Sequence, residues 1–210
     1  MCRRTGRQQR TPDPEAAVPE TPYRVAVIIG SNRRGRFAPN VSDWFLRTAA
    51  DRSDLDLDAV DLAEHPLPDL GNEPTPEQAE VLAALSLRLA AADAFVVITP
   101  EYNHSFPAVL KNAIDWHKAE WEAKPVGFVS YGGIGGGLRA VEQLRLVFAE
   151  LHAVTVRDTV SFHGAWAAFG DDGEPVAPAV PTGAAKGMLD QLTWWARALR
   201  DARTAHPYGA

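Results

Sequence analysis

The sequence has a single cysteine, Cys2, among its 210 residues, and it has no apolar run that approaches the length of a membrane span. One cysteine cannot form a disulfide within the chain, which suits a reducing compartment such as the cytoplasm. A catalytic thiol is disfavoured as well, because a polar N-terminal segment provides no fixed surroundings to lower a thiol pKa. We therefore expect a cytoplasmic protein that does not associate with membranes.

The sequence also lacks an excess of basic residues. Its 21 lysine and arginine residues are outnumbered by 27 aspartate and glutamate residues, for a formal net charge of −6. Nucleic acids and anionic membranes bind basic surfaces, so this balance favours small-molecule partners. The hydrophobic share of 46% and the charged share of 23% are ordinary for a globular protein.

Large apolar residues are nearly missing from the first 22 residues, which read MCRRTGRQQRTPDPEAAVPETP. Such a composition is typical of a disordered tail, and it lacks the apolar centre of a signal peptide. We expect residues 1–22 to be this tail and residues 23–205 to form one domain.

From residue 23 onward, apolar β-branched runs alternate with segments of helical periodicity. Strands are expected at residues 24–30, 55–62, 93–99, 125–131 and 154–162. Helices are expected at residues 38–52, 76–92, 107–118, 138–152 and 184–202. The second helix begins with a Thr-x-x-Gln capping box at Thr75, and an irregular segment with room for a small ribbon precedes the last helix.

Five strands that alternate with helices predict an α/β fold with a parallel sheet covered on both faces. Five strands with a closing helix favour a flavodoxin-like three-layer sandwich of strand order 2-1-3-4-5. In that order, the loops after strands 1, 3 and 4 share one crevice, where ligands of open α/β sheets bind. These are the three most unusual loops in the sequence.

The loop after the first strand reads GSNRRGR and leads into a helix. Free N–H groups and the helix dipole attract anions at such a position. Ser31 can donate a hydrogen bond, and Arg33 and Arg36 can form charge-assisted bonds to phosphate oxygens. A solvated basic turn explains the loop equally well, and the motif is neither a P-loop nor a dinucleotide fingerprint.

The loop after the fourth strand, SYGGIGGG, exposes backbone that can approach a flat ring or an oxyanion closely. Ser130 opens a serine-hydrolase alternative with His163 as its one candidate base. Phe128, however, stands where a nucleophile elbow has its first glycine.

The loop after the third strand begins PEYNHS. Pro100 fixes the turn out of the strand, Tyr102 offers an aromatic face, and Asn103 offers a donor and an acceptor. An anion site, an aromatic platform and a wall of N–H groups describe a pocket for a phosphorylated flat heterocycle. In a flavodoxin-type sheet, this pocket suggests FMN.

Three motifs, in this order and at these distances, resemble the NADPH-dependent FMN reductase family: GSNRRGR, PEYNHSFPAVLKNAIDW and SYGGIGGGLRAVEQLR. The resemblance implies noncovalently bound FMN, with NADPH or NADH as co-substrate. It implies phosphate contacts from Ser31, Arg33 and Arg36, although many members carry Ser at the position of Arg36. It implies contacts to the flavin ring and ribityl chain from Pro100, Glu101, Tyr102, Asn103, Ser130, Gly132 and Gly133.

The resemblance also implies the reaction. Hydride passes from NAD(P)H to N5 of bound FMN and then, by a ping-pong mechanism, to a quinone, a free flavin or a similar acceptor. Because the flavin carries the chemistry, we expect no catalytic side chain. His104 and His117 have no metal-ligand spacing to another His or Cys, so we also expect no metal site. Arg33 or Arg34 is the expected partner of the NADPH 2′-phosphate. Relatives assemble as dimers or tetramers, which implies a homodimer or homotetramer.

A flavodoxin-like electron carrier, or an FMN-binding module without its own turnover, is the alternative. Flavodoxins hold phosphate in a loop rich in Thr, Ser and Gly, so the arginines favour the reductase. We expect the width of the pocket to depend on loops near residues 66–74, 116–124 and 166–181. Trp116 and Trp121 are expected to cover the flavin or to lie at a subunit interface.

Overall fold

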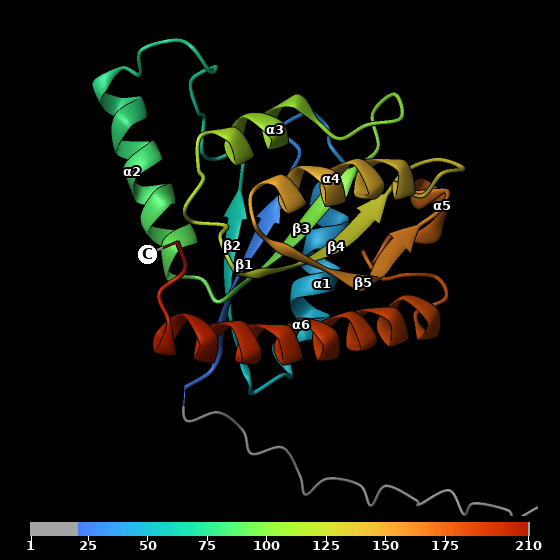
Figure 1. The fold of residues 1–210 in the computed structure, drawn as a ribbon. Coiled ribbons are helices and arrows are strands. Elements are labelled where there is room, and N and C mark those ends of the chain that lie inside the picture. The colour runs from blue at the N-terminus through green and yellow to red at the C-terminus, as the bar shows by residue number, and fades with distance from the viewer. Residues whose placement is uncertain (1–20, 210) are drawn as a thin grey trace, which may run out of the picture.

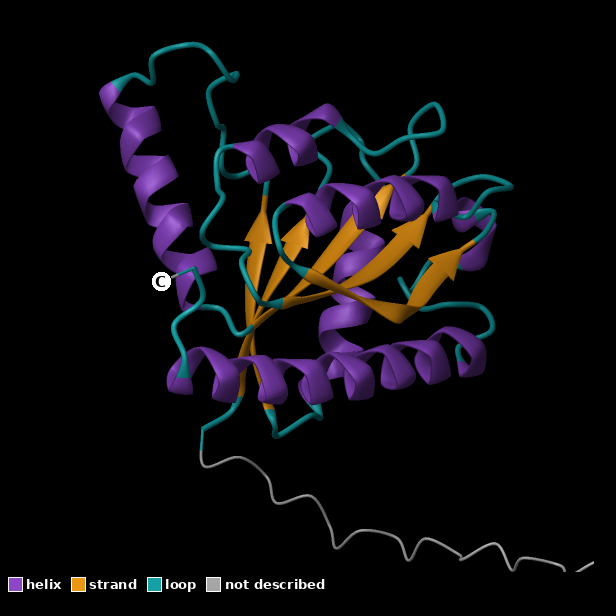
Figure 2. Cartoon of the chain, in the orientation of Figure 1, coloured by secondary structure: helices purple, strands orange, loops and turns teal. Residues whose placement is uncertain are grey.

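The structure is a computed structural model that describes residues 21–209. The expected tail, residues 1–22, lies outside this range except for its last two residues. A twisted sheet forms the middle layer of the domain, and helices cover both of its faces (Figure 1). In the colouring by secondary structure, the arrows of the sheet run in the same general direction (Figure 2).

The sheet has the predicted strands and the predicted order. Its strands are β1 (Tyr23–Ile29), β2 (Leu55–Asp61), β3 (Ala94–Pro100), β4 (Pro125–Tyr131) and β5 (Val154–Phe162). All neighbours pair in parallel, in the order β2-β1-β3-β4-β5. The flavodoxin-like strand order is therefore confirmed. The loops after β1, β3 and β4 lie side by side at the carboxyl ends of the strands.

The helices divide between the two faces of the sheet. They are α1 (Ala38–Ala50), α2 (Pro76–Ala91), α3 (Ala108–Asp115), α4 (Leu138–Glu150), α5 (Ala165–Ala168) and α6 (Ala179–Ala205). One core contains buried residues of α1 and α6, and the other contains buried residues of α2, α3 and α4. This division is visible in Figure 1, where α6 lies on the side of the sheet opposite α3 and α4.

Alternate side chains of each central strand contribute to the two cores on opposite faces of the sheet. Val25 and Val27 of β1 belong to the core under α1 and α6, whereas Ala26 and Ile28 belong to the core on the other face. Successive side chains of a strand point to opposite faces, so a strand covered on both sides is apolar throughout. The edge strand β2 is only partly buried, as its alternating sequence predicts.

Trp121 has a different role from the one expected. It is 1% exposed, and its ring lies 4.6 Å from that of Phe95 and 5.4 Å from that of Phe148, between ring centroids. Its indole N–H donates to the carbonyl of His117. Trp121 is therefore a core residue, and the prediction that it covers the cofactor or an interface is wrong.

Two segments differ from the prediction. The last helix begins at Ala179 rather than at residue 184, because Pro181 falls in the first turn, where proline is tolerated. In the segment before it, expected to be irregular with room for a small ribbon, the difference is the four-residue helix α5. An isolated antiparallel bridge between Phe169 and Pro175 agrees with the expected ribbon. Within residues 21–209, no helix combines the length and the apolar character needed to cross a membrane.

Candidate functional site

The loops that follow β1, β3 and β4 meet beyond the carboxyl ends of these strands. The Oγ of Ser31, after β1, lies 3.0 Å from the Oη of Tyr102, after β3. The N–H of Glu101 donates to the carbonyl of Tyr131 at the end of β4. A cavity of about 710 Å³, here called the cleft, lies among these loops and is of the size of small-molecule sites. Its lining residues are Arg33, Arg34, Gly35, Arg36, Phe37, Pro100, Glu101, Tyr102, Asn103, Tyr131, Gly132 and Trp166.

Most of the residues predicted to contact the cofactor line this cleft, but three do not. Ser31 and Ser130 are completely buried, and Gly133 lies exposed at the tip of the Gly-rich loop. Of the three loops expected to set the width of the pocket, only the last contributes to the lining, through Trp166.

The β1–α1 loop presents unpaired N–H groups and positive charge to the cleft. Its one internal backbone hydrogen bond runs from the N–H of Arg36 to the carbonyl of Arg33. Within residues 21–209, the guanidinium groups of Arg33 and Arg34 form no ion pair. The loop enters α1 without a side-chain cap. Helix N-termini attract anions, and two unpaired arginines strengthen that attraction.

Arg36 is engaged differently from Arg33 and Arg34. Its Nη1 donates to the carbonyl of Ser31 and to Oδ1 of Asp61, and its Nη2 donates to Oδ2 of Asp61. Hydrogen bonding to Asp61 raises the pKa of Arg36. The Arg36–Asp61 pair is electrically neutral and ties the β1–α1 loop to the end of β2. Only Nε and one N–H of Nη2 are left for the predicted phosphate contact.

The β3–α3 loop owes its dense polar sequence to a tight turn. The N–H groups of Tyr102 and Ser105 each donate to the carbonyl of the other, and Asn103 and His104 between them have φ of 50° and 68°. Two central residues with positive φ are typical of a type I′ turn, and Asn adopts this conformation more readily than most residues. Gln143 of α4 holds the turn by donating to the carbonyl of His104 and accepting from the Ser105 hydroxyl.

Glu101 serves as an anchor in this loop. Its Oε1 pairs with Nη1 of Arg139, and its Oε2 accepts the N–H of the same residue at 3.3 Å. Arg139 lies in the first turn of α4, where the helix dipole favours a carboxylate. Glu101 therefore fastens the β3–α3 loop to α4, and its predicted flavin contact stays a prediction.

Ser130 faces away from the cleft. Its hydroxyl donates to the carbonyl of Gly136 at 2.8 Å, and Gly137 packs over it. The adjacent residue of β4, Tyr131, has the opposite orientation and lines the cleft. Sequence position placed Ser130 at the right strand end, but the alternation of side chains puts the neighbouring tyrosine at the cavity.

The Gly-rich loop supplies backbone groups unevenly. The N–H of Gly132 is already used, since it donates to the carbonyl of Phe162 at 3.1 Å. The N–H of Gly136 closes a turn by donating to the carbonyl of Gly133. Among the described residues, the N–H groups of Gly133, Ile134 and Gly135 donate to no protein acceptor. Donors for a ligand are thus available at the tip of the loop rather than at Gly132.

Aromatic side chains that the sequence analysis left out form part of the cleft. The ring centroid of Phe37 lies 6.1 Å from that of Tyr131 and 6.5 Å from that of Trp166. The Oη of Tyr131 is buried and has no hydrogen-bond partner, and burial raises the pKa of this hydroxyl. A strand-end tyrosine beside a Gly-rich loop is a signal that could have identified Tyr131. No local signal marks Trp166, which reaches the cleft from an irregular segment.

The serine-hydrolase alternative receives no geometric support. Ser130 is bonded to Gly136, and the serine near His163 is Ser161, with 3.3 Å between Oγ and Nε2. The Ser161 hydroxyl also donates to the carbonyl of Gly136, and Nδ1 of His163 bonds the carbonyl of Ile134. These groups hold the Gly-rich loop in place instead of forming an activated nucleophile.

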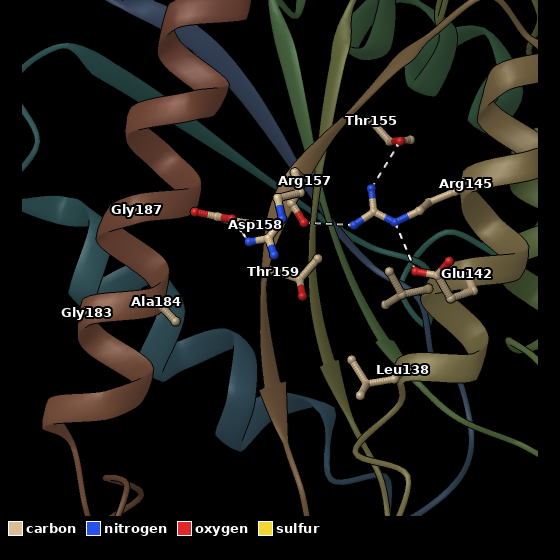
Figure 3. A pocket seen from close by; sticks show the side chains of 11 residues that line it. Leu138, Glu142, Arg145, Thr155, Arg157, Asp158, Thr159, Gly183, Ala184 and Gly187 are labelled. Atoms are coloured by element: carbon tan, nitrogen blue, oxygen red, sulfur yellow. Dashed lines mark hydrogen bonds and ion pairs between the residues drawn. The ribbon is translucent and has the colours of Figure 1, made fainter.

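A second cavity, of about 650 Å³, lies where β5 forms the edge of the sheet, between α4 and α6 (Figure 3). Arg145 reaches from α4 toward the strand, where it donates to the carbonyls of Val156 and Arg157 and to the hydroxyl of Thr155. Its donors therefore satisfy the open strand edge and are not directed at a ligand. The cleft at the strand ends remains the candidate site.

The chain is similar in sequence and in fold to known proteins. A family model described as NADPH-dependent FMN reductase matches residues 23–167. The chain is 38% identical over 134 residues to an NAD(P)H-dependent FMN reductase of Schizosaccharomyces pombe, covering 59% of this chain and 64% of the relative. It is 36% identical over 138 residues to a 2-hydroxy-1,4-benzoquinone reductase of a Burkholderia species, covering 62% of this chain and 73% of the relative. The chain thus spans less than two thirds of the length of the first of these relatives.

A solved structure of similar fold is the flavoenzyme NAD(P)H:(acceptor) oxidoreductase FerB from Paracoccus denitrificans. The TM-score is 0.64 at 23% sequence identity, and the match covers 83% of this chain and 98% of that one. At this identity the likeness concerns the fold alone.

Proposed function

Because this chain belongs to the NADPH-dependent FMN reductase family, we propose that it is an oxidoreductase that binds FMN in the cleft. NADPH or NADH is the electron donor, and a quinone, a free flavin or a similar small molecule is the acceptor. Relatives named as FMN and quinone reductases support this range of acceptors. The expected homodimer or homotetramer stays a prediction.

The residues of the cleft fit FMN. Two arginines without ion pairs and a helix N-terminus suit its phosphate, and the N–H groups at residues 133–135 suit the polar edge of its ring. Two arginines without ion pairs in the described part of the chain, in a ligand-sized cavity between the loops after β1, β3 and β4 and beside a helix N-terminus, are the observation that carries the proposal.

Bound FMN supplies the capacity to accept a hydride and to pass electrons on, as flavins do. The protein binds, orients and shields it. Arg33 and Arg34 hold the phosphate, while the neutral Arg36–Asp61 pair keeps their loop in position. Phe37 and Tyr131 exclude water from one wall of the cleft. A ping-pong order, in which the oxidised nicotinamide leaves the cleft before the acceptor enters it, is part of this proposal.

The phosphate assignment can be tested by comparing FMN with riboflavin, which lacks the phosphate. We expect the double variant Arg33→Ala, Arg34→Ala to bind FMN about 10- to 100-fold more weakly, the size of one or two lost charge-assisted hydrogen bonds. Riboflavin binding should change less than about 3-fold, because riboflavin has no phosphate for the two guanidinium groups to bind. Flavin fluorescence titration measures both dissociation constants.

The matched control is Arg157→Ala, which removes an arginine that is 94% exposed and lies on β5. It should leave FMN binding as in the wild type. Equal weakening of FMN and riboflavin, or equal weakening by Arg157→Ala, would contradict the assignment. Anaerobic NADPH should then bleach the yellow wild-type protein. A yellow protein that neither NADPH nor NADH bleaches would instead be an electron carrier.

A further inference from the structure

Trp166 is a large aromatic side chain at the cleft that the fold leaves open to solvent. It lines the cleft and is 68% exposed. A single exposed apolar residue is ordinary on a protein surface. Trp194 on α6, at 64% exposed, is an example that lines no part of the cleft. Trp166 differs because it is exposed at the candidate site and because hydrogen bonds hold the backbone next to it.

Residues 163–165, which precede Trp166, form a short ladder of hydrogen bonds to the Gly-rich loop. Three successive donors, Nδ1 of His163 and the N–H groups of Gly164 and Ala165, bind the three successive carbonyls of residues 134, 133 and 132. The distances are 2.8, 2.8 and 3.0 Å. Ala165 itself is completely buried. The backbone of the residue that follows it, Trp166, is therefore held close to the Gly-rich loop.

Aromatic neighbours support the indole from behind. The ring centroid of Phe37 lies 6.5 Å from that of Trp166, at an interplanar angle of 56°. Phe37 in turn packs edge-on against Phe169 at 5.5 Å. A tryptophan side chain has only two χ angles, so it has little rotamer freedom to lose when a ligand arrives. Its exposed surface is available to a molecule that enters the cleft.

We propose that Trp166 determines substrate specificity by stacking on the planar ring of the redox partner that enters the cleft beside FMN. The shared chemistry is a flat conjugated ring, supplied either by the nicotinamide or by an aromatic acceptor of the quinone class. The inference rests on the proposed function. Stacking favours flat rings over saturated rings of the same size, and a compact inorganic acceptor gains nothing from it.

Binding is tested on FMN-loaded protein with a redox-inert planar probe, 2-naphthoate, and its saturated counterpart, decahydro-2-naphthoate. Calorimetry should show that Trp166→Ala weakens binding of 2-naphthoate about 5- to 30-fold, as expected for the loss of one aromatic stack. Trp166→Phe should restore the affinity to within about 3-fold of the wild type. The saturated probe should bind with an affinity that changes less than about 2-fold in either variant.

Kinetics then separate the two sources of the ring. One arm measures the KM for NADPH with ferricyanide as acceptor, and the other measures the KM for a naphthoquinone at saturating NADPH. If Trp166→Ala raises only one of these two KM values, by about 5- to 30-fold, the ring of that substrate is the one that stacks on Trp166. A rise in both arms means that both rings use the platform. The control Trp194→Ala should leave both KM values as in the wild type.

Several results would overturn the proposal. Trp166→Ala could weaken both probes equally, could change neither KM, or could do no more than Trp194→Ala. The affinity of each variant for FMN is measured first, so that a failure of the proposed function can be distinguished from a failure of the role proposed for Trp166. Wild-type protein that fails to bind FMN refutes the proposed function together with this inference. Wild-type protein that binds FMN and turns over, with Trp166→Ala unchanged, refutes the role of Trp166 alone.

Discussion

At the residue scale, Gly137 and Gly133 occupy the same loop but leave very different space for a side chain. Gly137 has φ of 84°, and a Cβ there would lie 2.6 Å from Cβ of Ser130 and 2.8 Å from the N of Tyr131. A Cβ at Gly133 would meet no atom within 4 Å. The first glycine lets the loop fold back over the strand end, and the second leaves the tip of the loop open.

We therefore predict that Gly137→Ala destabilises the protein by about 2–4 kcal/mol, from left-handed backbone strain and steric overlap together. Gly133→Ala is the matched control and should cost less than about 1 kcal/mol. Urea unfolding measures both free energies. If the two variants prove equally stable, the close packing of Gly137 against Ser130 and Tyr131 is not a constraint on the loop.

The sequence predicted the strand-end positions of several polar residues but not their bonding partners. Arg36, Glu101 and Ser130 were each expected to contact the cofactor. The structure pairs the first with Asp61, the second with Arg139 and the third with the carbonyl of Gly136. The position of a residue at a strand end can be predicted from the sequence. Its hydrogen-bond partner depends on which other segment the fold brings near.

At the element scale, the start of α2 shows how local sequence can determine a structure completely. The N–H of Gln78 donates to Oγ1 of Thr75 at 3.3 Å, and the N–H of Thr75 donates to Oε1 of Gln78 at 3.0 Å. Pro76 occupies the first helical position. The predicted capping box is confirmed, because all its partners lie within four consecutive residues.

We predict that Thr75→Ala lowers the free energy of unfolding by about 1 kcal/mol, through the loss of the cap. In a double-mutant cycle with Gln78→Ala, the two changes should be less than additive, since each removes part of the same box. The control Thr182→Ala, in the first turn of α6, should stay within about 0.5 kcal/mol of the wild type. Additive effects in the cycle would show that the two side chains act independently.

Helix α5 shows the opposite behaviour. It has four residues, and the preceding Gly164 has φ of 55°. A helix this short is unstable by itself, and hydrogen bonds to the Gly-rich loop hold it in place. Periodicity cannot reveal such an element, because the stabilising partners lie about 30 residues earlier in the chain.

At the scale of the whole molecule, ion pairs tie the edge strand β2 and its flanks to the rest of the domain. Asp54 bonds Arg52, Asp58 bonds both Arg88 and Arg24, and Asp61 bonds Arg36. Hydrogen bonds from arginine lower the pKa values of Asp54 and Asp58. At Asp61, burial opposes ionisation, but hydrogen bonds from Arg36 and Ala63 outweigh it and also lower the pKa.

A carboxyl group whose pKa is lower in the folded state than in the unfolded state stabilises the fold above its unfolded pKa, about 3.9 for Asp. That stability is lost as the pH falls through the folded value. We predict that the free energy of unfolding declines below about pH 4, as measured by urea unfolding across pH 3 to 7. The ion pairs at Asp54, Asp58 and Asp61 should account for part of this decline.

Asp58→Asn provides the test, and Asp56→Asn on the same strand provides the control, since Asp56 is exposed and forms no ion pair within residues 21–209. Asp58→Asn should be less stable than the wild type at pH 7 and should lose less stability between pH 5 and pH 3. Asp56→Asn should follow the wild-type curve. Parallel curves for all three proteins would mean that the Asp58 pairs contribute nothing to acid stability.

The sequence by itself determined the number and order of the strands, the capping box at Thr75 and the edge of the sheet at which the cleft lies. These features follow from apolar periodicity and from contacts within a few residues, both of which are written locally in the chain. Only the tertiary structure decided that Asp61 neutralises Arg36, that Trp121 is a core residue and that Trp166 lines the cleft. Each of these outcomes depends on segments far apart in sequence, whose distances are set only when the two helical layers pack against the sheet.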